Sequence, residues 1–276
     1  MKKVVIAIDS FKGCLSSAEA GKAAAEGIRS VFPECEILSL PIADGGEGML
    51  DVLIAATNGR EVQISAHNPL MEWHDTYYGI SEDGKTAFIE MASISGLPLV
   101  PPEKRNPMLT TSYGTGELIR DALERGCRNF IIGIGGSATN DAGLGMLQAL
   151  GFRFLDKEGK ILETGNGKIL MEVVSIDTSF VHPDLRTSHF TVACDVQNPF
   201  YGLEGAAYIF APQKGPENGR GAGCRHEKLC RSHFPHNGER HFQSFRNRCG
   251  RWYGWQFTGF SECKIETGYT VDAGDS

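Results

Sequence analysis

A glycine-rich segment carries the clearest candidate site in the sequence. It runs from Gly133 to Asp141, between an apolar run and a helical pattern. Glycines let backbone N–H groups approach an anion closely, and a following helix N-terminus adds unsatisfied N–H groups. The segment predicts a phosphate-binding loop, with a tight structural turn as the alternative and with Thr139 or Asn140 as the helix cap. The candidate nucleotide-binding residues are Gly133, Gly135, Gly136, Ser137, Thr139, Asn140 and Lys214.

Acidic and basic side chains follow other expected strands. Asp44 lies among glycines, and Asp195 ends an apolar run. Carboxylates in such loops can bind Mg²⁺ or orient a hydroxyl, so both are candidate metal ligands and catalytic residues. For Asp44 an acidic turn is the alternative. Lys12, like Lys214, can neutralise a phosphate or a carboxylate, and a solvated lysine is the alternative.

Hydroxyl and acidic groups also suggest where a substrate would bind. Asp9 and Ser10 follow the first apolar run, and the segment 110–116 is rich in Thr and Ser. The hydroxyl-rich run can bind an anion or simply cap the helix that follows it, and a capped helix start is also the alternative for the residues after the first run. The candidate substrate-binding residues are Asp9, Ser10, Ser112 and Thr115.

The elements that must position these loops alternate between strands and helices up to about residue 215. Strands are expected at 4–8, 36–40, 129–134, 152–155, 190–194 and 207–210, with further short strands between 61 and 91. Helices are expected from the capping box at Ser16 to Phe32, up to about Thr57, and over 113–125 and 142–150. This alternation predicts a mostly parallel sheet with its function at the carboxyl ends of the strands.

Composition limits the classes of protein. The chain has 276 residues and a net charge of −7, which argues against a nucleic-acid partner. The sequence has no apolar run long enough to span a bilayer, so no membrane association is expected. The N-terminal pattern predicts a first strand rather than a signal peptide. We therefore expect a cytoplasmic location, with the cysteines as free thiols.

Six motifs in order resemble the bacterial glycerate kinases of the glycerate-2-kinase type. They occupy residues 9–13, 43–48, 111–119, 133–141, 194–199 and 212–215. Ala142 is a departure, because the family often has Gly there. The resemblance implies transfer of the ATP γ-phosphate to D-glycerate with Mg²⁺, with 2-phosphoglycerate as the favoured product. It also implies an α/β fold, in which a Rossmann- or flavodoxin-like parallel-sheet domain carries a second, inserted mixed α/β domain.

The corresponding domain prediction has three parts. Residues 1–62 form the first part of the Rossmann-like domain, 63–215 form the inserted domain, and 216–276 form an aberrant tail. From Glu217 to Ser276 the only Leu, Ile and Val residues are Leu229, Ile265 and Val271, too few for a core. Read one base later, the codons for 247–255 can encode a glycine-rich stretch, and those for 260–275 an aliphatic one. The tail is therefore predicted to be an out-of-frame translation.

Two alternatives stay open at this point. Gly133, Gly135 and Ala138 also fit the pattern G-x-G-x-x-A, with Asp156 at the distance of a ribose-binding acid, which suggests an NAD(P)-dependent oxidoreductase. The cysteines and histidines between Cys224 and Cys263 suggest an inactive remnant with a metal-binding tail, although their spacing fits no common zinc finger. The sequence predicts no oligomeric state.

Overall fold

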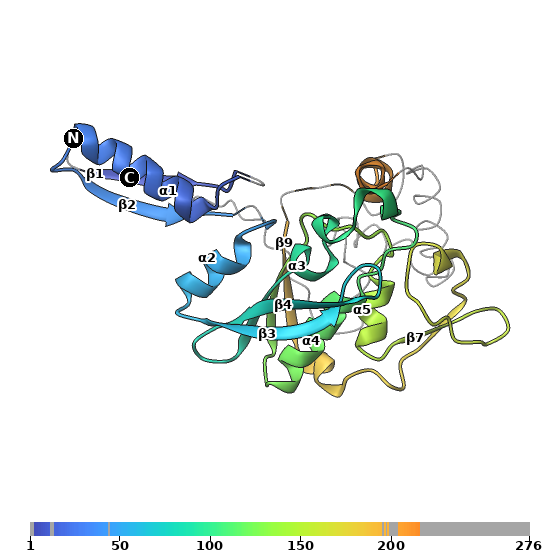
Figure 1. Ribbon diagram of the computed structural model, residues 1–276. Helices are drawn as coiled ribbons and strands as arrows, with labels where there is room; N and C mark the ends of the chain where they lie inside the picture. The colour runs from blue at the N-terminus through green and yellow to red at the C-terminus, as the bar shows by residue number, and fades with distance from the viewer. Residues whose placement is uncertain are drawn as a thin grey trace.

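The computed structural model describes residues 3–11, 14–43, 45–194, 196, 198 and 204–215. A small unit made by β1, α1 and β2 lies to one side of a larger body (Figure 1). The strands β1 (Lys3–Ile8) and β2 (Glu36–Pro41) pair in parallel, and α1 (Ser17–Val31) packs against both. The predicted capping box begins α1: Ser16 Oγ accepts the N–H of Glu19 at 3.2 Å, and the Glu19 carboxylate accepts the N–H of Ser16 at 2.8 Å.

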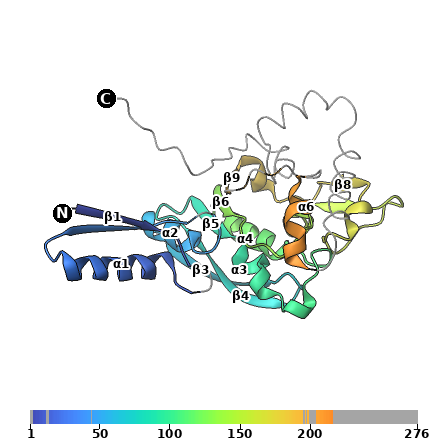
Figure 2. The ribbon, with the colours of Figure 1, turned by 90° about the horizontal axis from the view of Figure 1, so that it is seen from above.

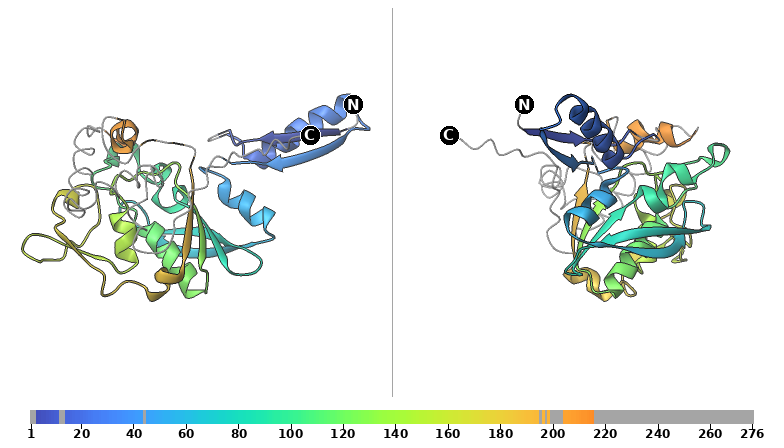
Figure 3. Two further views of the ribbon diagram at one scale, coloured as in Figure 1. Left: turned by 180° about the vertical axis from the view of Figure 1, so that it is seen from behind. Right: turned by 60° about the vertical axis from the view of Figure 1, so that its left-hand side comes forward.

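One side of the β1–β2 pair is exposed. The side that α1 covers carries the buried Ile6 and its register partner Ser39, whose side chain faces Gly21 of α1. On the other side Val5 and its register partner Leu38 are 56% and 43% exposed. Figure 2 shows α1 along one side of the two strands only, and the left view of Figure 3 shows the unit beside the body.

The larger body is built on a five-stranded sheet with the order β3-β4-β5-β6-β9. The first three strands form an antiparallel meander, and β6 and β9 continue it in parallel with β5. Glu90, Gly133 and Ala193 end the three parallel strands and are register partners, so they form one row at the carboxyl edge. The bounds are β3 (Arg60–His67), β4 (Trp73–Ile80), β5 (Thr86–Glu90), β6 (Asn129–Gly133) and β9 (His189–Ala193).

Helices cover both faces of this sheet. On one face α4 (Tyr113–Glu124) packs with α5 (Leu144–Ala149), and Asp121 of α4 accepts the hydroxyl of Tyr78 at 2.6 Å. The next residue of β4, Gly79, faces Leu50 and Ile54 of α2 (Met49–Ala56). Since neighbouring residues of a strand point to opposite faces, α2 covers the face opposite α4.

The remaining elements are short and mostly peripheral. The strands β7 (Arg153–Leu155) and β8 (Ser175–Asp177) form a separate antiparallel pair. The short helices are α3 (Ala92–Ser95) and α6 (Ala206–Phe210), with 3-10 turns η1 (Leu97–Leu99), η2 (Pro102–Lys104), η3 (Ile169–Met171), η4 (Pro183–Thr187) and η5 (Ala211–Lys214). No helix in the described ranges is long and apolar enough to cross a membrane.

The structure confirms a mixed α/β fold, but the main sheet is mixed rather than mostly parallel, because the expected short strands between 61 and 91 form an antiparallel meander at its edge. Two expected elements are also corrected. The segment 207–210 was expected as a strand and is part of α6, because so short an apolar run does not distinguish the two and its alanines favour a helix. The helix expected from Ala142 begins at Leu144, because Ala142 and Gly143 have φ angles of 54° and 74°. The expected boundary between residues 62 and 63 falls within β3, and the division into domains stays a prediction.

Candidate functional site

Two glycine-containing loops meet at the carboxyl edge of the parallel strands. The N–H of Gly135 donates to the carbonyl oxygen of Gly45 at 3.3 Å. A Cβ on Gly45, whose φ is +89°, would lie 2.7 Å from the carbonyl oxygen of Ala193, and a Cβ on Gly133 would lie 2.6 Å from that of Gly45. Only glycine permits this spacing, so the sequence brings the 45–48 segment against the ends of β6 and β9.

The glycine-rich loop itself keeps two backbone donors available. The carbonyl oxygen of Gly136 accepts the N–H of Leu97 at 2.9 Å, and the N–H of Ala138 donates to Ser95 at 2.9 Å. Between these anchors, the described residues supply no acceptor for the N–H groups of Gly136 and Ser137. Gly136 is exposed and Ser137 is 9% exposed, and two consecutive N–H groups in a turn are the donors that an anion such as a phosphate requires.

Lys214 places a cation against the same loop. Its Nζ donates to Ser137 Oγ at 2.7 Å and to the carbonyl oxygen of Thr139 at 2.8 Å. The side chain is 7% exposed, and burial lowers the pKa of Lys214 to about 8, with the Asp141 carboxylate acting in the opposite direction. The structure thus joins Lys214 to the predicted phosphate-binding residues.

Asp141 fixes the end of the loop. Its Oδ2 accepts both the N–H and the hydroxyl of Ser112, at 2.8 and 2.6 Å, and the N–H of Gly145 at 3.2 Å. Its Oδ1 accepts the N–H of Gly143 at 3.1 Å. Burial raises the pKa of Asp141, whereas these hydrogen bonds lower it. The N-cap residue of α5 is Gly143, and the Asp141 carboxylate accepts N–H groups at the start of this helix. The expectation that Thr139 or Asn140 would cap the helix is therefore wrong.

The candidate substrate-binding residues fall into two groups. Ser112 and Thr115 are buried with internal partners, Asp141 for the first and Ser95 at 2.8 Å for the second. Asp9 and Ser10 follow β1, where Asp9 Oδ1 accepts the N–H of Ser10 at 2.7 Å. All four assignments to the substrate stay predictions.

Ser17 connects the end of β1, beside Asp9, to the residues that follow β2 and lead into the 45–48 segment. Ser17 Oγ donates to the carbonyl oxygen of Ile8 at 2.6 Å and accepts the N–H of Ile42 at 3.1 Å. The carboxyl ends of β1 and β2 are therefore tied together. This tie places the residues after β1 and the residues after β2 at one edge of the small unit.

Sequence reasoning missed one acidic residue at the strand edge. Glu90 is 7% exposed, and its Oε2 accepts the N–H groups of Gly48 at 3.1 Å and of Leu50 at 3.3 Å. Burial raises the pKa of Glu90 to about 7, and the charges of Asp51 and Glu47 add to this. An acid at the end of an apolar run was the signal that identified Asp195, and the run 86–90 offers the same signal.

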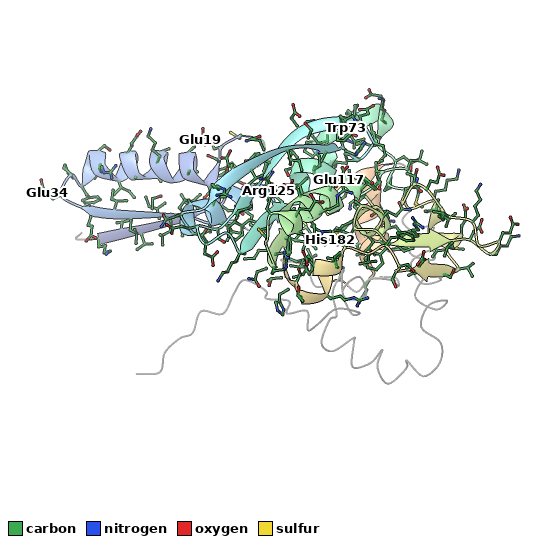
Figure 4. All side chains as sticks on the ribbon, turned by 90° about the horizontal axis from the view of Figure 1, so that it is seen from below. Glu19, Glu34, Trp73, Glu117, Arg125 and His182 are labelled. Atoms are coloured by element: carbon green, nitrogen blue, oxygen red, sulfur yellow. The ribbon has the colours of Figure 1, made fainter. Side chains whose placement is uncertain are left out.

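Sequence reasoning also missed a pair formed by His67 at the end of β3 and Glu117 of α4. His67 Nδ1 is 3.0 Å from Glu117 Oε1, and the ring of His67 lies 4.1 Å from that of Trp73 between centroids. Figure 4 labels Trp73 and Glu117 on the body, away from Glu19 and Glu34 of the small unit. No sequence pattern distinguished this pair, because its partners lie 50 residues apart.

Several predicted residues lie outside the described ranges. They are Lys12, Asp44, Asp195 and the tail 216–276 with its cysteines and histidines. The predicted change of reading frame therefore stays a prediction. Within the described ranges, no group of three or more His, Cys, Asp or Glu side chains is arranged to hold a metal ion.

The comparison with known families identifies the chain. A model of the glycerate kinase family matches residues 4–223. The chain belongs to the glycerate kinase family. It is 53% identical over 213 residues to the glycerate 2-kinase of Escherichia coli K12 and 52% identical over 213 residues to the glycerate kinase of Bacillus subtilis 168. Each alignment covers 77% of this chain and 56% of the relative, so this member of the glycerate kinase family spans about half the length of those relatives.

A solved structure agrees with the fold. A crystal structure described as a glycerate kinase 2 from Salmonella typhimurium LT2 superposes with a TM-score of 0.78 and 40% sequence identity. The match covers 97% of this chain and 72% of that chain. The mixed α/β arrangement of this glycerate kinase family member is therefore that of a solved relative.

Proposed function

We propose that this chain transfers the γ-phosphate of ATP to D-glycerate, with 2-phosphoglycerate as the product. The observation that carries the proposal is the loop 133–140, which presents the N–H groups of Gly136 and Ser137 at a strand edge with Lys214 behind it. The family match supports the kinase class, and the name of the Escherichia coli relative, glycerate 2-kinase, supports the position of the phosphate. The proposal also includes a cytoplasmic location and the two-domain division at residues 62 and 63.

The described residues suggest how the nucleotide would be bound. The two free N–H groups of the loop would bind phosphate oxygens, and the ammonium group of Lys214 would offset their charge. Because Lys214 Nζ also donates a hydrogen bond to the carbonyl oxygen of Thr139, it would keep the loop in one conformation with or without nucleotide. In this assignment Gly133 and Gly135 permit the close packing beneath the loop, and Asn140 lies at its end.

The acids and Lys12 complete the proposed site. Asp44 and Asp195 are the proposed Mg²⁺ ligands. Gly45, which follows Asp44, packs closely on Ala193, which lies two residues before Asp195, at the strand edge. Carboxylates suit this ion, which when bound would offset the negative charge that develops on the phosphates. Lys12, Asp9 and Ser10 are proposed to bind the glycerate carboxylate and hydroxyl groups, with Ser112 and Thr115 supporting that side of the site.

The proposed reaction is a displacement at phosphorus. The 2-hydroxyl oxygen of glycerate forms a bond to the γ-phosphorus, and the bond from that phosphorus to the β–γ bridging oxygen breaks, which releases ADP. The hydroxyl proton passes to a carboxylate, for which Asp195 is the proposed base. The protein contributes mainly position and charge to this reaction.

The dinucleotide alternative has no support. In a Rossmann site the ribose-binding acid follows a strand of the same parallel sheet. Asp156 instead follows β7, which pairs with β8 in a separate two-stranded sheet. Its carboxylate accepts the N–H groups of Glu158 and Lys160 at 2.8 and 2.9 Å in a turn.

The direct test is to incubate the purified chain with MgATP and D-glycerate and to follow ADP release. The product is then examined by ³¹P NMR. The proposal predicts ADP release that depends on D-glycerate and a phosphorus signal coupled to the hydrogen on C2. ADP release that does not depend on glycerate, or none at all when the Escherichia coli relative turns over in the same buffer, would overturn it.

Binding of ATP tests the loop separately from turnover. Lys214→Met is expected to weaken ATP binding about tenfold or more in calorimetry, because it removes a buried charge behind the loop. Lys157→Met, in an exposed turn, is the matched control and should leave binding unchanged. Equal affinities for the two variants would contradict the assignment of Lys214.

A further inference from the structure

The Glu90 carboxylate connects two segments that are distant in sequence. Glu90 ends β5 and is the register partner of Gly133 on β6, the first residue of the glycine-rich loop. Its Oε2 reaches the N–H groups of Gly48 and Leu50, which are 42 and 40 positions away along the chain. One side chain thus fastens the start of α2 to the edge that carries the glycine-rich loop.

The start of α2 needs such a partner. Gly48 is its N-cap residue and has no side chain to accept a helical N–H, and its φ is 90°. The first N–H groups of a helix have no partner within the helix, and here an acid from another strand accepts two of them. Glu90 is 7% exposed, so water is a poor substitute for this acceptor.

The fastened segment is also the one that packs on the loop. Gly45, three residues before Gly48, accepts the N–H of Gly135 at its carbonyl oxygen. A Cβ on Gly135 would lie 2.7 Å from the Cα of Gly46. A displacement of Gly48 would therefore change the contact between the two loops. Asp44, one of the two proposed Mg²⁺ ligands, directly precedes this segment in sequence.

The geometry points to Glu90 as a positioning residue. Its carboxylate fixes the 45–48 segment against the glycine-rich loop and so sets the distance between these two parts of the proposed phosphoryl-transfer site. We assign Glu90 no contact with substrate or nucleotide. The inference rests on the proposed function for its catalytic consequence, whereas the structural part concerns only Gly48, Leu50 and Gly135.

Protonation of Glu90 should weaken this link. The ionised carboxylate is the stronger acceptor, so the link is strongest above the pKa of the group, which is about 7. Among the described residues, Asp51 of α2 and Glu47 act electrostatically on Glu90. Glu90 in turn acts on Tyr77 of β4. Glu47 and Asp51 are acidic and favour the protonated form.

The first experiment measures the backbone amides by NMR between pH 5 and 9. In the parent chain the Gly48 and Leu50 amide signals should shift with a midpoint near pH 7, and in Glu90→Gln this titration should disappear. Glu90→Gln keeps the size of the side chain, so the variant should remain folded. Glu82→Gln, in an exposed turn, is the matched control and should preserve the titration. Unchanged Gly48, Leu50 and Gly135 signals in Glu90→Gln would overturn the inference.

The second experiment measures turnover of the same variants. Glu90→Gln is expected to lower kcat about tenfold with a smaller change in KM for ATP, and to remove the loss of kcat below pH 7. A parent-like kcat and pH profile would overturn the positioning role. If the parent itself transfers no phosphate to glycerate, the proposed function fails, and the amide titration alone decides whether Glu90 fastens the loop.

Discussion

Lys214 Nζ lies 2.7 Å from Ser137 Oγ, so a lysine 77 positions further along the chain fixes the glycine-rich loop. The same ammonium group bonds the carbonyl oxygen of Thr139, on the other side of Ala138. The loop is therefore fastened at two points by one buried cation. An ammonium group in this position costs desolvation energy, and its contacts offset only part of that cost.

The cost of burying Lys214 predicts how stability depends on pH. Burial lowers the pKa to about 8 from an ordinary value of 10.5, so between these values the unfolded chain binds more protons. The free energy of unfolding should therefore rise as the pH increases from 8 to 10.5, by roughly 3 kcal/mol at most, and this contribution should be constant below pH 8.

Urea unfolding at pH 7.5 and pH 10 measures this dependence. Lys214→Met should lack the rise, and Lys157→Met should keep it. The comparison uses the difference between variants, since tyrosines and cysteines titrate alike in all of them. A rise of equal size in Lys214→Met would show that the lysine is not the group responsible.

Asp141 is predicted to be the costliest acid to replace in the described part of the chain. Its two oxygens accept hydrogen bonds from Ser112, Gly143 and Gly145. In Asp141→Asn the amide group would face at least one N–H donor, so a loss of about 2–4 kcal/mol in the free energy of unfolding is expected. Chemical denaturation measures it, with Asp156→Asn, at a partly exposed position beside a turn, as the control. A similar small loss in both variants would mean that the buried network is not required.

The elements that local patterns determine were predicted well. The capping box at Ser16 and the proline after Phe32 mark the two ends of α1, and both signals lie within the helix or beside it. The segment 206–210 has no comparable signal. Its five residues are too few to show a helical period, and Ala207 packs with Met108, which is distant in sequence.

The candidate site was predicted only in part, because its geometry depends on strand register. The spacing of the glycines in 133–136 is enough to predict the loop. The hydrogen bond between Glu90 and Gly48 instead depends on which strands are neighbours in the sheet. The row of Glu90, Gly133 and Ala193 exists because β5, β6 and β9 are adjacent and in register. Such long-range pairings leave no periodic trace in one sequence. The role of Asp141 at the start of α5 was missed for a similar reason, since its partner Ser112 is the residue before α4, 29 positions away.

Ala142 offers a stabilising substitution. Its φ of 54° lies in the left-handed region, where a Cβ is unfavourable, and the sequence analysis noted that the family often has Gly there. Ala142→Gly should raise the free energy of unfolding by about 0.5–1 kcal/mol, measured by urea denaturation. Ala23→Gly, the same chemical change on the exposed side of α1, should lower it by a similar amount. If both variants lose stability, the backbone at residue 142 is not strained.

The exposed side of the β1–β2 pair predicts binding of an apolar dye. Val5 and Leu38 are neighbours in register and are 56% and 43% exposed, whereas parallel strands are usually covered on both faces. The dye ANS should fluoresce with the parent chain, and the double variant Val5→Thr, Leu38→Thr should reduce this fluorescence with little change in the free energy of unfolding. Ile6→Thr changes the side that α1 covers, where the side chain is 6% exposed. It should instead cost about 1–2 kcal/mol, because it buries a hydroxyl in place of apolar surface. Equal fluorescence from the parent and the double variant would show that the dye binds elsewhere and that this face is not the accessible apolar surface.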